Sequence, residues 1–265
     1  MFDFLFKKRR REELRRRPLP AEQRSLIQRN VPYVSALSDA DQHELEGHIQ
    51  VFLAEKTFEG CGGLAMTDEI KLTIAAQACL LLLHRETDYY PDLSSILVYP
   101  SAYVVKNTRQ RIGDLVVESD QVRLGESWIR GAVVLAWDAV QHGAASPHDG
   151  QNVVLHEFAH QLDAEDGAMN GAPDLGSRSS YSAWAQALGA EYEDLLARVA
   201  AQKPADIDEY GATSPAEFFA VVTEAFFERG GELKSEHSEL YEVLRAFYRQ
   251  DPAALAKKPM TPRVE

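Results

Sequence analysis

The sequence has little cysteine, no long hydrophobic run and no broad excess of positive charge. Its 265 residues include only two cysteines, Cys61 and Cys79, which do not form a C-x-x-C pair. We therefore expect two free thiols, and neither a disulfide framework nor a cysteine-rich metal site. The longest apolar run, in "AAQACLLLLH", is too short to span a membrane. These absences argue against a disulfide-stapled extracellular domain and against a transmembrane protein.

The net charge of −13 is unevenly distributed along the chain. Residues 1–17 contain eight Lys or Arg and three acidic residues, a net charge of +5, so the remainder carries −18. An acidic body argues against direct nucleic-acid binding, because phosphates require a broad basic face. The basic N-terminal arm, residues 1–20, is either a solvated, partly frayed terminus or a weak contact with anionic lipid or an acidic partner. The arm lacks the features of a secretory signal, so we expect a cytoplasmic protein.

Hydrophobic periodicity predicts an α+β fold that is predominantly helical and contains a small mixed sheet. Ser38 and Thr67 each precede an apolar helical pattern and are predicted helix N-caps. We expect one domain over residues 21–252 and a flexible C-terminal tail over 253–265. The expected strands are "SSILVYP", "AYVV" and residues 129–137, and the expected later helices are about 150–164, 179–201, 214–229 and 236–249.

The stretch "VVLHEFAHQLD", residues 153–163, contains two histidines that are four residues apart. On an α-helix this spacing places His156 and His160 on one face, where both can bind one zinc ion. Glu157 lies about 100° around the helix from His156, so it can reach a water molecule beside the metal. Two hydrogen-bonded histidines on a helix surface are the ordinary alternative. The rest of the helix is apolar, and burying ionisable groups is costly unless they are paired or metal-bound, which favours the metal site.

A catalytic zinc ion needs a third protein ligand, and no further histidine follows at H-x-x-G-x-x-H spacing. The segment "EYGATSPAEFFAVVTEAFFERG" offers Glu217 and Glu224, which are seven residues apart and therefore share nearly one helical face. One could bind the metal while the other fixes a ligand histidine through its second nitrogen. Glu217 also has a capping alternative, because Ser214 and Glu217 match a capping box. From spacing alone both roles of Glu217 stay open.

Two features next to the histidine motif each have two alternative roles. Asp163 shares a face with His156, so it could accept a hydrogen bond from a ligand imidazole or from an amide of the following loop. The strand before the motif could align an extended substrate by backbone pairing. We expect this role for an edge strand at about Ala132–Ala136, with a plain sheet strand as the alternative.

"HEFAHQLD" together with "YGATSPAEFFAVVTEAFF" resembles the Mlc titration factor A family of bacterial zinc peptidases and regulators, over nearly the whole chain. The pair of motifs is also similar to the catalytic domain of anthrax lethal factor, which implies a gluzincin-like zincin fold with an H-E-x-x-H active-site helix. The resemblance implies that Glu217 is the third zinc ligand and that Tyr210 faces the metal. Lethal factor has a second glutamate four residues after its ligand, where this chain has Val221, and Glu224 is the candidate for that outer role.

The resemblance implies one Zn²⁺ per chain, aminopeptidase-like cleavage of peptides, and binding to the repressor Mlc. In such a site Glu157 acts as general base and the Tyr210 hydroxyl stabilises the developing oxyanion. The alternative is a non-catalytic regulatory binding protein that titrates a transcription factor. Glu157 favours the enzyme, because a pure binding module needs no general base.

Overall fold

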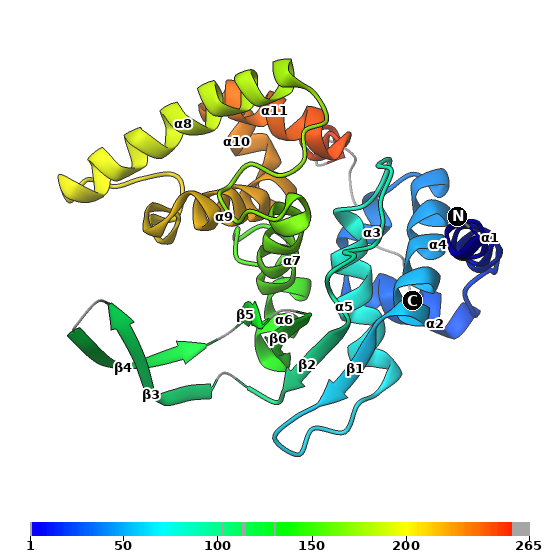
Figure 1. Ribbon diagram of the computed structural model, residues 1–265. Helices are drawn as coiled ribbons and strands as arrows, with labels where there is room; N and C mark the ends of the chain where they lie inside the picture. Colours follow the sequence, from blue (N-terminus) through cyan, green and yellow to red (C-terminus); the bar gives the residue numbers. More distant parts are fainter. Residues whose placement is uncertain (1, 102, 113–114, 124, 130, 256–265) are drawn as a thin grey trace.

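The structure is a computed structural model that describes residues 2–101, 103–112, 115–123, 125–129 and 131–255. Its helices and small sheets confirm the predicted α+β class, and α7 lies between the N-terminal and C-terminal groups of helices (Figure 1). The helices of the N-terminal half are α1 (Phe2–Arg15), α2 (Ala21–Asn30), α3 (Tyr33–Ala36), α4 (Asp39–Glu55) and α5 (Asp68–Leu80).

The two predicted N-caps in this half are confirmed. The Ser38 hydroxyl accepts a hydrogen bond from the Asp41 amide at 3.2 Å, and the Thr67 hydroxyl accepts one from the Ile70 amide at 3.3 Å. Each bond satisfies an amide that has no partner within the first helical turn. Helices α4 and α5 therefore start where the sequence predicts, and they pack against each other.

A four-stranded mixed sheet lies below these helices in Figure 1. The strand order is β1-β2-β6-β5, in which β1, β2 and β6 are parallel and β5 is antiparallel to β6. A separate antiparallel pair, β3 and β4, forms a hairpin between β2 and β5 in the sequence. The strands are β1 (Thr57–Gly60), β2 (Ser95–Tyr99), β3 (Tyr103–Ile112), β4 (Leu115–Arg123), β5 (Gly125–Ile129) and β6 (Ala132–Ala136).

The expectation that Ala132–Ala136 forms an edge strand is wrong. This segment, β6, pairs with β2 on one side and with β5 on the other. Gly131, at φ +87°, reverses the chain between β5 and β6, a conformation that glycine adopts without steric cost. Ile129 therefore belongs to β5, and β5 is the edge strand that contacts α7.

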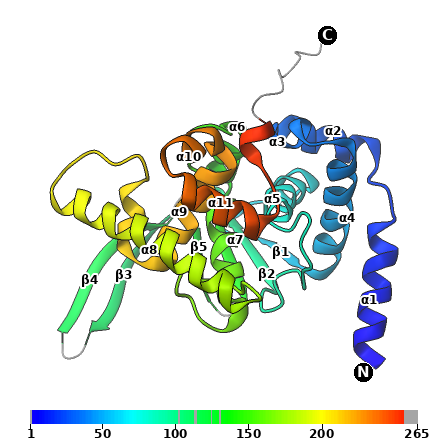
Figure 2. The same ribbon diagram turned by 90° about the horizontal axis from the view of Figure 1, so that it is seen from above.

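The C-terminal half is helical, as predicted. One departure is that the region after residue 229 contains an additional short helix, α10, before the predicted last helix. Figure 2 shows α8, α10 and α11 grouped around α9 on one side of α7. The helices are α6 (Trp137–Ala145), α7 (Val153–Asp163), α8 (Arg178–Ala200), α9 (Pro215–Glu228), α10 (Gly230–Glu236), α11 (Ser238–Tyr248) and α12 (Pro252–Leu255), with short 3₁₀ turns η1 (Ala164–Asp166) and η2 (Glu209–Thr213).

Aromatic packing fixes α7 and α9 from opposite sides. On α7, the Phe158 ring lies 5.7 Å from that of Phe52 and 4.9 Å from that of Tyr90. On α9, the Phe219 ring lies 5.5 Å from that of Trp184. Truncating such a buried ring to alanine typically costs about 3–5 kcal/mol. The apolar faces of both helices thus point into the core, and their polar faces meet.

The ends of the chain differ in part from expectation. Residues 2–15 form α1, which packs on α4, so the expectation of a frayed terminus is wrong for this segment. The expected tail begins inside α12, and residues 256–265 lie outside the described residues. The division into arm, single domain and tail stays a prediction. Within the described residues, no helix has both the length and the apolar character required to cross a membrane.

Candidate metal centre

Helix α7 begins at an asparagine that caps it. The Asn152 side-chain oxygen accepts hydrogen bonds from the amides of Val154 and Leu155, both at 3.1 Å. The Asn152 carbonyl accepts a hydrogen bond from the His156 amide at 2.9 Å. The cap therefore sets the rotation of the first helical turn, and with it the direction of the first histidine.

Helix α9 begins at a serine cap followed by proline. The Ser214 hydroxyl accepts a hydrogen bond from the Glu217 amide at 3.2 Å, and Pro215 occupies the first helical position. The Glu217 backbone thus takes part in the cap, while its side chain extends toward α7. A full capping box would also need the Glu217 carboxylate to accept a hydrogen bond from the Ser214 amide. That carboxylate instead contacts His156 and His160, so it is placed for the ligand role.

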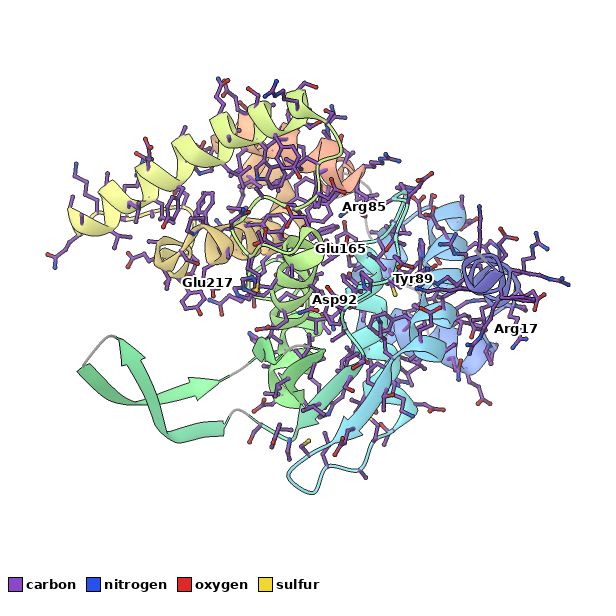
Figure 3. The ribbon with its side chains drawn as sticks, in the orientation of Figure 1. Arg17, Arg85, Tyr89, Asp92, Glu165 and Glu217 are labelled. Carbon is purple, nitrogen blue, oxygen red and sulfur yellow. The ribbon has the colours of Figure 1, made fainter. Side chains whose placement is uncertain are left out.

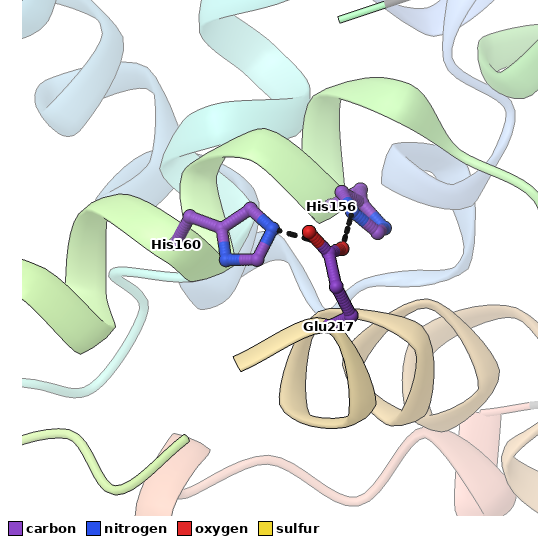
Figure 4. A group of neighbouring side chains, drawn as sticks. All are labelled: His156, His160 and Glu217. Atoms are coloured by element: carbon purple, nitrogen blue, oxygen red, sulfur yellow. Dashed lines mark hydrogen bonds and ion pairs between the residues drawn. The ribbon is translucent and has the colours of Figure 1, made fainter. Parts of the chain in front are cut away.

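The side chains of His156, His160 and Glu217 converge between the two helices (Figure 4). One carboxylate oxygen of Glu217 lies 2.9 Å from His156 Nε2 and 3.3 Å from His160 Nε2. One potential ligand atom from each residue lies within 4.8 Å of the others. Two imidazole nitrogens and one carboxylate oxygen on rigid helices match a metal site that keeps further positions open. The residues therefore fit a bound metal ion.

The electrostatics of this centre favour a cation. Burial alone would lower the pKa of His156, but its hydrogen bonds to Glu217 and Glu224 raise it to about 10. Burial alone would raise the pKa of Glu217, but its hydrogen bonds to His156 and His160 lower it to about 2. The raised pKa of His156 reflects the carboxylates around its ring, and the lowered pKa of Glu217 reflects the imidazoles that donate to it. The ionised carboxylates that surround the imidazoles would also stabilise a divalent metal ion.

Glu224 lies behind His156, about two helical turns after Glu217 on the same face of α9. Its carboxylate accepts a hydrogen bond from His156 Nδ1 at 2.7 Å and a second one from the Asn152 amide. Burial raises the pKa of Glu224, and the neighbouring His156 opposes that effect. Glu224 therefore joins the ring of His156 to the first residue of its helix. This is the geometry of a carboxylate that orients a metal-binding imidazole.

Sequence reasoning missed three polar residues behind this carboxylate: Gln77, Asn152 and Glu228. The Asn152 amide group donates to Gln77 at 2.8 Å and to Glu228 at 2.9 Å, and all three side chains are buried. The other Glu228 oxygen accepts a hydrogen bond from the Gly150 amide at 3.0 Å. The signal for Glu228 was present, because it follows Glu224 by four residues and shares the face of Glu217 and Glu224. The signal for Asn152 was its position directly before an apolar helical pattern.

We expect Asn152→Ala to destabilise the fold by about 1–3 kcal/mol, because it removes the α7 cap and leaves buried partners without a donor. The measurement is the free energy of unfolding in urea. Ser177→Ala removes the exposed cap of α8 and serves as the control, with an expected cost of about 1 kcal/mol or less. Equal effects of the two substitutions would contradict a special role for Asn152.

The buried carboxyl group of Glu228 should make the stability of the fold depend on pH. Burial raises its pKa to about 8, even though the hydrogen bond from Asn152 acts in the opposite direction. The unfolded carboxyl titrates near its ordinary pKa of 4.5, so the stabilising contribution of the protonated folded group is complete below that pH and is lost as the pH rises through about 8. We expect the free energy of unfolding, measured in excess EDTA, to lose up to about 1.4 kcal/mol per pH unit between pH 5 and 8 through this group. Glu228→Ala should flatten that slope, whereas exposed Glu232→Ala should keep it; an unchanged slope in Glu228→Ala would contradict the assignment.

Asp163 ties the end of α7 to the start of α9. One of its oxygens accepts a hydrogen bond from the Gly171 amide at 2.8 Å. Of the two partners expected for Asp163, this is the amide of the loop that follows α7. Gly171 has φ +77°, and a Cβ there would lie 2.3 Å from the Pro215 carbonyl oxygen. Only glycine permits this approach. Among the described residues, Asp163 Oδ1 and His160 Nδ1 have no hydrogen-bond partner, and contact of Asp163 with an imidazole stays a prediction.

The two expected catalytic residues lie beside the candidate metal-binding cluster. Glu157 is on α7 and is only 5% exposed. Tyr210 is on η2, and its ring centroid lies 5.9 Å from that of His156. Tyr210 is 54% exposed, so it lies on the solvent side of the cluster. The structure thus brings all the sequence-predicted side chains to one region between α7, α9 and η2, and their catalytic roles stay predictions.

Comparison with known proteins defines the class to which this centre belongs. The model of the glucose-regulated metallo-peptidase M90 family matches residues 5–249, and the chain belongs to this family. Membership indicates a metallopeptidase-like protein and implies a metal ion, for which His156, His160 and Glu217 are a candidate set. The family resemblance seen in the motifs is therefore confirmed.

Individual relatives cover most of the chain. An uncharacterized protein of Synechocystis sp. is 47% identical over 244 residues, which are 92% of this chain and 89% of that protein. Mlc titration factor A of Serratia proteamaculans is 33% identical over 227 residues, 84% of this chain and 86% of that protein. Mlc titration factor A of Yersinia pestis is 30% identical over 232 residues, 86% of this chain and 85% of that protein. The name of the last two relatives points to a regulatory role for them.

Proposed function

We propose that the protein is a zinc-dependent metallopeptidase of the zincin type, with aminopeptidase-like activity in the cytoplasm. The observation that carries the proposal is the convergence of His156, His160 and Glu217 at hydrogen-bonding distances. This donor set is the one that catalytic zinc takes, with a position left for water or substrate. Structural zinc sites usually have four ligands and are rich in cysteine, and no cysteine belongs to this cluster.

When bound, zinc would supply a Lewis acid that lowers the pKa of water and polarises a carbonyl group. Glu157 would take the proton from the attacking water and deliver it to the leaving amine. Glu224 would hold the His156 ring through Nδ1, so that Nε2 faces the metal position. The Tyr210 hydroxyl would donate a hydrogen bond to the developing oxyanion. The edge strand β5 would pair with an extended peptide backbone.

The activity is tested with substrates that separate amino-terminal from internal cleavage. We expect hydrolysis of aminoacyl p-nitroanilides with a free α-amine, loss of hydrolysis in EDTA, and recovery when zinc is added back. N-acetylated forms of the same substrates should react poorly. Preferential cleavage of blocked peptides would contradict the aminopeptidase-like activity, and no cleavage of either kind would contradict the peptidase.

We expect Tyr210→Phe to lower kcat by about 10- to 1000-fold, because the hydroxyl acts on charge that develops only in the transition state. The zinc content and KM should change little. Tyr181→Phe removes the hydroxyl of another exposed tyrosine, on α8, and should leave kcat unchanged. A kcat for Tyr210→Phe equal to that of Tyr181→Phe would remove Tyr210 from the mechanism.

A regulatory function is the second candidate, and the name of the Mlc titration factor A relatives favours it. In this case the protein binds a transcriptional repressor of the Mlc type and does not itself contact nucleic acid. Binding and hydrolysis are not exclusive. Glu157→Ala should still bind purified Mlc if the binding surface is separate from the catalytic residues, whereas loss of binding would show that the two functions share a site.

A further inference from the structure

Helix α1 presents two different basic faces, and its inner face is already paired with acidic groups of the body. Arg11 donates to Glu55 at 2.8 Å and also bonds Asp88. Arg15 donates to the Tyr89 hydroxyl at 2.7 Å. The Arg11 side chain is only 11% exposed. These contacts fix which side of α1 faces α4, and therefore which side faces solvent.

The outer face of α1 combines arginines with an exposed aromatic ring. Phe6 is 65% exposed, and the Arg9 side chain is 76% exposed. Arg10 is also exposed, and at about 100° per residue it lies on the same half of the helix as Phe6 and Arg9. The acidic residue Glu13 lies on this face too and pairs with Arg9 at 3.2 Å.

The positive surface continues beyond the end of the helix. Arg16 and Arg17, which follow α1, are exposed, and Figure 3 shows Arg17 on the side of the molecule away from Glu217. Arg9, Arg10, Arg16 and Arg17 give four exposed arginines at this end of the chain, against two exposed glutamates, Glu12 and Glu13. The remainder of the chain after residue 17 carries −18. The molecule is therefore strongly polarised, with one basic helix on an acidic body.

We infer that the outer face of α1 binds the surface of an anionic lipid bilayer. A helix that combines arginines with a protruding aromatic side chain fits the headgroup layer, where guanidinium groups meet phosphates and the ring enters the acyl boundary. Extended nucleic acid fits less well, because a single basic helix gives no broad basic face and the acidic body repels phosphates. Repulsion between the acidic body and the anionic lipids also keeps the body away from the membrane, so the protein would touch the bilayer through α1.

Vesicle co-sedimentation of the full chain tests this inference. Vesicles of phosphatidylcholine with 30 mol% phosphatidylglycerol should bind the protein at low salt, and pure phosphatidylcholine vesicles should bind it much less. Each arginine near an anionic surface contributes about a fivefold change in partitioning. The triple variant Arg9→Gln/Arg10→Gln/Arg16→Gln should therefore weaken binding by about 100-fold.

The matched control removes three exposed basic residues elsewhere, as Arg178→Gln/Lys203→Gln/Arg245→Gln, and has the same net charge as the triple variant. It should bind nearly as well as the natural chain. Phe6→Ser should weaken binding at both low and high salt, because it removes the apolar contact. Equal loss in the control and the α1 variant, or binding to duplex DNA without binding to vesicles, would overturn the inference. Because no step involves the metal, this test is independent of the proposed peptidase activity.

Discussion

Replacing Glu157 by glutamine is expected to lower kcat/KM for peptide hydrolysis by about 10²–10⁴-fold, the usual contribution of a positioned general base. Glutamine has nearly the same shape as glutamate but cannot take a proton from water. Glu157 is not one of the three converging ligand candidates, so the metal content should stay at that of the natural protein. The measurements are initial rates on aminoacyl p-nitroanilides and zinc per chain by elemental analysis.

The control for this substitution is Glu193→Gln, at an exposed position on α8. It removes the same charge from the chain without touching the centre, and its kcat/KM should equal that of the natural protein. Near-normal turnover by Glu157→Gln would remove the general-base assignment. Loss of both turnover and zinc would instead place Glu157 among the residues that hold the metal.

Replacing Glu217 by alanine is expected to weaken zinc binding by well over about 100-fold, which is more than the loss typical of an outer-shell residue. The substitution removes the only carboxylate in the cluster and leaves two imidazoles as ligands. Glu224→Ala should weaken zinc binding by about 10–100-fold, because His156 loses the acceptor that orients it. Competition against a chelator of known affinity gives both values.

The comparison of the two losses of zinc affinity decides which glutamate binds the metal: the loss should be larger in Glu217→Ala than in Glu224→Ala. His142→Ala, at an exposed histidine on α6, should leave zinc binding unchanged and controls for nonspecific loss of imidazole. A larger loss in Glu224→Ala than in Glu217→Ala would exchange the proposed roles of the two glutamates. Thermal melts in EDTA would separate these effects from general destabilisation.

Much of the candidate site could be predicted because it depends on local helical geometry. The four-residue spacing of His156 and His160 and the seven-residue spacing of Glu217 and Glu224 determine shared faces whatever the tertiary fold. Ser214 marks the start of α9 through hydrogen bonding within four residues. The assignment of Glu217 rather than Glu224 to the metal depended on the family resemblance, because spacing alone treats both carboxylates alike.

The features that the sequence did not reveal depend on contacts between distant segments. β5 pairs with β6 across the turn at Gly131, and this pairing places β6 inside the sheet. The hydrogen bonds of Asn152 to Gln77 and Glu228 join residues more than 70 positions apart. No periodic pattern within one helix carries such information. The fold of the basic arm likewise depends on Arg11 meeting Glu55 on another helix.

The buried polar network connects these distant contacts to the candidate metal centre. Glu224 contacts the His156 ring and the Asn152 amide, and Asn152 in turn contacts Glu228. The position of His156 therefore depends on hydrogen bonds that join α7, α9 and, through Gln77, α5. A site supported in this way is preorganised, which is what metal binding and transition-state stabilisation require.

The most direct test of the central claim is an anomalous difference map from crystals of the zinc-loaded protein, recorded on both sides of the zinc absorption edge. We predict one peak per chain between α7 and α9, within about 2.0–2.2 Å of His156 Nε2, His160 Nε2 and a Glu217 oxygen. A zinc peak bound elsewhere, or no zinc peak between these helices, would contradict the claim that these three residues form a catalytic zinc site.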